Sequence, residues 1–181
     1  MLIQAYNLLK NLFSVIIDGV YGGVPRRPVP VFSGPMAANT YLQINCKYTG
    51  DPGKGIIDYS TNPEVLQAAM EAGAKGNKDA AFANMHIDCD DYAAWAYAAC
   101  HKIPGCLGNI YTLLDSGLVG SHVIFVGFYK GGYFAIDTNG YRVLPDNTET
   151  TICRVWSTIY AGNGYKYIQA VITPFPFPVP V

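Results

Sequence analysis

Apolar and polar residues recur with a helical period in the first half of the chain and with a strand period in much of the second half. Polar residues at three- and four-residue intervals in segment 1–19 predict an amphipathic helix that ends at Gly19. Three further helices are expected, at 63–73, 79–84 and 88–101. Asn62 is the expected N-cap of the first of these, and Gly73 its expected C-terminal cap.

The second half alternates apolar and polar residues in short runs that are typical of strands. Five strands are expected, at 110–114, 122–129, 133–137, 141–144 and 167–172. The dipeptides Gly131-Gly132 and Asn139-Gly140 predict hairpin turns between them. Helices followed by an antiparallel sheet indicate an α+β fold.

Both ends of the chain differ in composition from its middle. The expected regions are 1–36, an amphipathic helix and a Pro/Gly-rich arm; 37–172, one folded domain; and 173–181, an extended Pro-rich tail. Residues 1–19 lack a basic leading segment and carry regularly spaced polar residues, so no secretory signal peptide or transmembrane span is expected. Apolar segments at the ends of a chain tend to be buried against another protein surface. This predicts a homo-oligomer or a larger assembly through the terminal arms.

The composition narrows the class of protein. Half of the 181 residues are apolar and 14% are charged, with a formal net charge of −1. One domain with a full core is expected, and no nucleic-acid partner is predicted. The five cysteines form no Cys-x-x-Cys pair, so no metal site and no cofactor are expected. The odd number leaves at least one thiol unpaired, and the other four either form two disulfides or are reduced in the core. We favour reduced thiols, because free cysteine is often buried as a small hydrophobic residue.

Cys89 stands where the 88–101 helix is expected to begin. With Asp88 as the N-cap, Cys89 is the first helical residue, and the unpaired backbone N–H groups there favour a thiolate. The same N–H groups suit a developing oxyanion. Asp90 and Asp91 act against a thiolate, so we expect their side chains to point outward or to be compensated by a protonated His122.

His122 opens an apolar strand, and Asp137 ends the next one. A lone carboxylate at the end of an apolar strand requires a partner. A two-residue hairpin loop between these strands puts His122 and Asp137 on the same face of the sheet, whereas a three-residue loop puts them on opposite faces. The pair would supply the base that a thiol nucleophile needs and the group that orients this base.

Three short segments carry this chemistry in the order Cys, His, Asp. They read DCDDYA at 88–93, SHV at 121–123 and IDTN at 136–139. Their order, together with the interval of fifteen residues from His122 to Asp137 (137 minus 122), resembles the transglutaminase-like superfamily, and most closely its bacterial cysteine peptidases. The resemblance covers roughly residues 60 to 145.

The resemblance implies a papain-like core in which a nucleophile helix packs on an antiparallel sheet. It also implies a catalytic triad of Cys89, His122 and Asp137 in domain 37–172, and a bacterial or phage origin. The backbone N–H of Cys89 would be one oxyanion donor. A second donor is expected from an upstream side-chain amide, and the candidates are Gln43, Asn45 and Asn84.

The expected function is that of a cysteine peptidase or amidase acting on peptide or protein amide bonds through a thioester on Cys89. Two alternatives stay open. Capture of the thioester by an amine would make the protein a transglutaminase with the same triad. The second alternative is a structural or assembly protein, for example of a virus particle, that has the same fold. The apolar ends and the low charge of the chain agree with this alternative.

Overall fold

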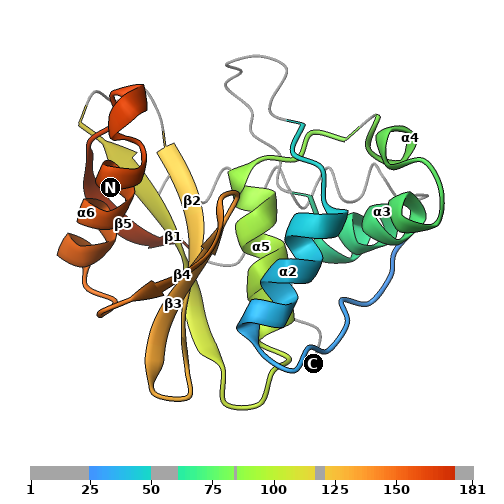
Figure 1. Ribbon diagram of the computed structural model, residues 1–181, viewed down its shortest axis with the longest axis horizontal. Coiled ribbons are helices and arrows are strands. Elements are labelled where there is room, and N and C mark those ends of the chain that lie inside the picture. The colour runs from blue at the N-terminus through green and yellow to red at the C-terminus, as the bar shows by residue number, and fades with distance from the viewer. Residues whose placement is uncertain (1–24, 50–60, 84, 117–120, 174–181) are drawn as a thin grey trace.

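The computed structural model describes residues 25–49, 61–83, 85–116 and 121–173 (Figure 1). Its helices are α2 (Pro35–Asn45), α3 (Pro63–Lys75), α4 (Lys78–Phe82), α5 (Cys89–Cys100) and α6 (Glu149–Ile159), followed by a 3-10 turn at Ala161–Asn163. Its strands are β1 (Leu107–Asp115), β2 (Ser121–Tyr129), β3 (Gly132–Asp137), β4 (Gly140–Leu144) and β5 (Tyr167–Thr173). The α+β class and all five expected strands are confirmed.

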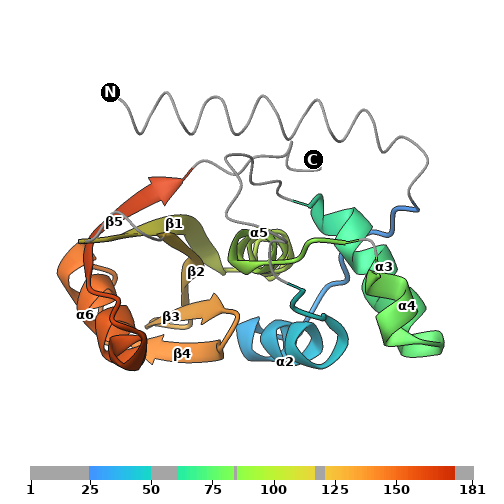
Figure 2. The same cartoon turned by 90° about the horizontal axis from the view of Figure 1, so that it is seen from above.

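The five strands form one antiparallel sheet in the order β4-β3-β2-β1-β5. Helices α2 to α5 lie on one side of this sheet, and α6 lies at the opposite end of the molecule (Figure 2). Alternate residues of β2 divide between two cores. Phe125 belongs to the larger core with α2, α3 and α5, whereas Ile124 and Val126 belong to the core beneath α6.

The turn between β2 and β3 fixes which residues face α6. Tyr129 pairs with Gly132, so the loop consists of Lys130 and Gly131. Both loop residues have positive φ, 49° and 83°, as a type I′ hairpin turn requires. The two-residue loop expected from the sequence is confirmed, one position earlier than the Gly131-Gly132 dipeptide.

Helix α3 begins as expected, because the Asn62 side chain accepts a hydrogen bond from the backbone N–H of Glu64 at 2.9 Å. The expected end at Gly73 is wrong, since the helix continues to Lys75. Gly73 instead allows α4 to pack closely. A Cβ atom at this position would lie 3.3 Å from the Cα atom of Lys78.

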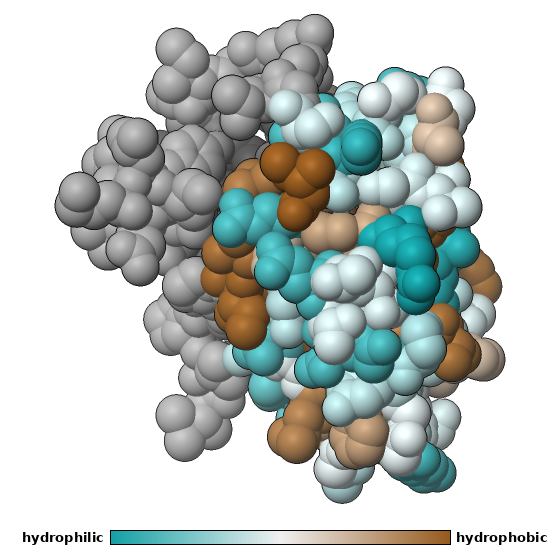
Figure 3. Space-filling model, turned by 90° about the vertical axis from the view of Figure 1, so that its left-hand side faces the viewer, coloured by the Kyte–Doolittle hydropathy of each residue, from teal (hydrophilic) through white to brown (hydrophobic). Residues whose placement is uncertain are grey.

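Two helices were not expected, α2 and α6. Helix α6 has Thr148 as its N-cap, and Ile152 and Trp156 are buried one turn apart on the side that faces the sheet. Figure 3 views the molecule from this side, where most of the coloured surface is hydrophilic or pale. Helix α2 contributes Ala38 and Leu42 to the larger core, both 0% exposed.

The expected terminal helix at 1–19 and most of the expected tail at 173–181 lie outside the described residues. Within the expected arm, Val29 is 3% exposed and packs in the larger core. The described helices include none with the length and apolar character needed to cross a membrane.

The close contact between β1 and β2 gives a test of the packing. A Cβ atom on Gly108 would lie 2.6 Å from the backbone oxygen of Val126 and 2.5 Å from Cζ of Phe125. The backbone oxygen cannot move without breaking the ladder, so Gly108→Ala is expected to lower the free energy of unfolding by about 1–3 kcal/mol in urea titrations. Gly162→Ala is the matched control, because its Cβ would meet no atom within 4 Å. Equal stability of the two variants would contradict this packing.

Candidate functional site

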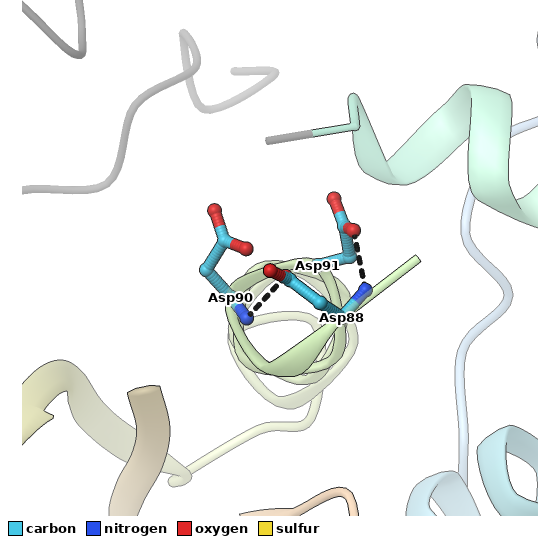
Figure 4. Close-up of side chains that lie close together, drawn as sticks. All are labelled: Asp88, Asp90 and Asp91. Atoms are coloured by element: carbon cyan, nitrogen blue, oxygen red, sulfur yellow. Dashed lines mark hydrogen bonds between the residues drawn. The ribbon is translucent and has the colours of Figure 1, made fainter. Parts of the chain in front are cut away.

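Cys89 is the first residue of α5, and a capping box holds the helix end around it. The Asp88 carboxylate accepts a hydrogen bond from the backbone N–H of Asp90 at 3.1 Å. In return, the Asp91 carboxylate accepts one from the backbone N–H of Asp88 at 2.9 Å (Figure 4). The expected N-cap is confirmed, so the thiol stands at the positive end of the helix dipole.

Cys89 also differs from the other cysteines in exposure. All five cysteines belong to the described residues and are free thiols, as expected; four are buried, and Cys89 is partly exposed. Burial raises the pKa of Cys46 to about 12 and also raises the pKa of Cys153. A hydrogen bond from Cys100 lowers the pKa of Cys106, but Cys106 is only 5% exposed. Cys89 is therefore the thiol that a substrate can reach.

The two aspartates after Cys89 do not point outward, contrary to one of the two arrangements expected. Asp90 is 6% exposed and Asp91 is 0% exposed. One carboxyl oxygen from each of Asp88, Asp90 and Asp91 lies within 4.8 Å of the other two (Figure 4). Burial, and then the charge of Asp90, raise the pKa of Asp91 well above its usual range. A raised pKa favours the neutral acid, which reduces the negative charge beside the Cys89 thiolate.

His122 and Asp137 form a buried pair on the face of the sheet that α6 covers. The Nε2 atom of His122 lies 3.1 Å from Oδ2 of Asp137. The side chains come from β2 and β3, and the Phe125–Ile136 pairing of these strands puts them on one face in diagonal positions. His122 is 7% exposed and Asp137 is 0% exposed. The structure thus brings together the two residues that the hairpin argument paired.

The Asp137 carboxylate has further donors. Trp156 of α6 donates its indole N–H to Oδ2 at 2.9 Å, and the backbone N–H of Asn139 donates to Oδ1 at 2.8 Å. Burial acts to raise the pKa of Asp137, but the hydrogen bonds from His122 and Trp156 outweigh it, so that the pKa falls below its usual value. Asp137 is therefore ionised at neutral pH and favours the Nε2–H form of His122.

Cys89 lies at the same end of the molecule as this pair. Figure 1 shows the N-terminal end of α5 beside the start of β2. Cys89 packs against a small buried cluster that contains Val123, the residue after His122. The rings of Tyr160 and Tyr167 contact the His122 ring, with centroids 5.2 and 6.5 Å away. Burial raises the pKa of both tyrosines, and the charge of Cys89 adds to this.

The three candidate oxyanion donors have different positions. The side-chain amide of Gln43 donates to the backbone oxygen of Asp137 at 3.0 Å, and that of Asn45 donates to the backbone oxygen of Tyr41 at 2.8 Å. Each amide nitrogen carries a second N–H. Asn84 lies outside the described residues. The assignment of a second oxyanion donor stays a prediction.

The sequence interpretation missed Trp156 and Tyr160, which both reach the His122–Asp137 pair from α6 and its C-cap. It placed Asn139 in a turn and in the motif at 136–139 but gave its side chain no role, although Asn139 donates to Asp137 and to Tyr160. The available signal was the apolar spacing of residues 152, 156 and 159 after the N-cap Thr148.

The lowered pKa of Asp137 makes its contribution to stability depend on pH. Ionised Asp137 stabilises the folded chain above its ordinary value of 3.8, and this contribution is lost as the pH falls through the lowered value. Asp137→Asn is therefore expected to lower the free energy of unfolding by about 1–3 kcal/mol at neutral pH, with a smaller difference in acid. Urea titrations at about pH 7 and about pH 3 measure this. A difference of the same size at both values would contradict the assigned ion.

Comparisons of the chain with protein-family models, with curated proteins and with solved structures found no match. The resemblance of its three motifs to transglutaminase-like cysteine peptidases therefore stays a prediction.

Proposed function

We propose that this chain is a cysteine peptidase or amidase that cleaves peptide or protein amide bonds through an acyl thioester on Cys89. One observation carries the proposal. The partly exposed cysteine stands at the capped N-terminus of α5, at the same end of the fold as a His122–Asp137 pair with an Nε2–Oδ2 distance of 3.1 Å. A helix-tip thiol with a base and an orienting carboxylate is the arrangement that thiol acyl transfer requires.

The reaction follows from the two nitrogens of His122. Because Nε2 faces Asp137, Nδ1 is the nitrogen that is left to accept the Cys89 proton. The thiolate attacks the carbonyl carbon, and the carbonyl oxygen takes the negative charge beside the backbone N–H of Cys89. His122 then protonates the leaving amine, which breaks the C–N bond and leaves the thioester.

Water completes the reaction in this proposal. His122 takes a proton from a water molecule, whose oxygen displaces the Cys89 sulfur and releases a carboxylic acid. The partial exposure of Cys89 gives water access to the thioester, which favours hydrolysis over transfer to an amine. The resemblance of the segments around the three residues to bacterial transglutaminase-like cysteine peptidases supports the same chemistry.

Selective alkylation tests this proposal. Iodoacetamide at neutral pH is expected to label Cys89 first, because an imidazolium at His122 and the helix dipole both stabilise its thiolate. His122→Ala is expected to slow the labelling of Cys89 by about tenfold or more. Mass spectrometry of the digested protein measures the labelling at each cysteine.

His86→Ala is the matched control, because His86 is exposed and precedes the helix. This variant is expected to label at the native rate. The proposal is contradicted when Cys89 reacts no faster than the buried cysteines in the native protein, or when both histidine variants behave alike.

A further inference from the structure

We propose that the hydroxyl group of Tyr160 is a positioning group that, together with Asn139, holds the His122 ring with Nε2–H toward Asp137 and Nδ1 free for the thiol proton. The role in catalysis rests on the proposed function, but the hydrogen bonds that define it do not. Tyr160 follows the last residue of α6 as its C-cap, and its backbone N–H donates to the backbone oxygen of Trp156 at 3.0 Å.

Helix α6 delivers two side chains to the histidine–aspartate pair from one turn. Trp156 and Tyr160 are four residues apart and so lie on the same face of the helix. Trp156 donates to Oδ2 of Asp137 at 2.9 Å, and the Tyr160 oxygen lies 3.4 Å from Nε2 of His122. One helix end therefore contacts both members of the pair.

The hydrogen bonds at the Tyr160 oxygen define its role. This oxygen accepts a hydrogen bond from the side-chain amide of Asn139. It also faces Nε2 of His122, which carries a proton because an ionised Asp137 lies 3.1 Å away. The Nε2–H group thus lies between two acceptors, at 3.1 and 3.4 Å, and forms a three-centre hydrogen bond.

Asn139 ties this arrangement to the turn after β3. Its backbone N–H donates to Oδ1 of Asp137, and its side-chain amide donates to the Tyr160 oxygen. A rotation of the His122 ring by half a turn would place a carbon where Nε2 now stands and break the contacts with both Asp137 and Tyr160. The tyrosine hydroxyl therefore opposes the ring orientation in which Nδ1 faces away from its present position.

The titratable groups that face His122 come from four elements. Asp137 belongs to β3, Tyr160 to the end of α6, and Tyr167 to β5, while Cys89 at the tip of α5 acts on both tyrosines. Among these groups, Asp137 and Tyr160 have side-chain oxygens within hydrogen-bonding distance of Nε2, at 3.1 and 3.4 Å. The hydroxyl of Tyr160 is thus the second acceptor for an imidazolium at this position.

Tyr160→Phe tests the hydroxyl and keeps the ring. An imidazolium that loses one acceptor stabilises the Cys89 thiolate less, so iodoacetamide labelling of Cys89 is expected to slow about tenfold at about pH 6. At about pH 9.5 the thiol ionises without this help, and the variant is expected to label at the native rate. Tyr165→Phe is the matched control, because Tyr165 belongs to the same tyrosine cluster: its ring stacks on Tyr167 and lies edge-on to Tyr160 at 6.2 Å. If Tyr160 had a merely structural role, Tyr160→Phe would slow the labelling of Cys89 at both pH values or at neither.

A second measurement separates this inference from the proposed function. In protein labelled with ¹⁵N-histidine, the ring nitrogens of His122 are assigned by their loss in His122→Ala. The native protein is expected to show a proton on Nε2 that exchanges slowly with water, and Tyr160→Phe is expected to exchange it faster. Unchanged ring signals in a folded Tyr160→Phe protein would overturn the inference, whether or not Cys89 proves to be a nucleophile. Faster exchange with an unreactive native Cys89 would uphold the positioning role and reject the peptidase.

Discussion

A carboxylate with no exposure to solvent needs hydrogen-bond donors around it, and Asp137 obtains them from three parts of the fold. His122 reaches it from β2, Trp156 from α6, and the backbone N–H of Asn139 from the turn that follows β3. An unpaired ion at this position would be strongly unfavourable. The same contacts that keep the buried charge therefore fix the β2–β3 register, the docking of α6 and the orientation of the histidine ring.

The other half of the site depends on a helix end. Asp88 and Asp91 satisfy backbone N–H groups at the start of α5 and leave the Cys89 thiol at the tip. The burial of Asp91 has a cost for the fold, since its raised pKa means that the ionised form is disfavoured. It has a benefit for the thiol, because a higher pKa leaves less negative charge on Asp91 to repel a thiolate. The pKa values of two carboxyl groups near the site thus shift in opposite directions: hydrogen bonds from His122 and Trp156 lower that of Asp137, whereas burial and the neighbouring Asp90 raise that of Asp91.

The sequence was sufficient for the strands, the start of α5 and the histidine–aspartate pair. These depend on local signals, namely alternation, an N-cap and a two-residue turn. Helix α6 was missed because six of its eleven residues are β-branched, ETTICRVWSTI, which favours a strand by propensity. Its helical form depends on burial of Ile152 and Trp156 against the far face of the sheet, a tertiary contact that no local pattern shows. The roles of Trp156 and Tyr160 were missed for the same reason.

The central claim is that Cys89 forms an acyl thioester with the help of His122. The most direct test is a brief reaction with p-nitrophenyl acetate, followed by mass spectrometry of the intact and digested protein. The native chain should gain one acetyl group on Cys89 that neutral hydroxylamine removes, and His122→Ala should gain it far more slowly. An acetyl group spread over several residues, or one on Cys89 that forms equally fast in His122→Ala, would contradict the claim.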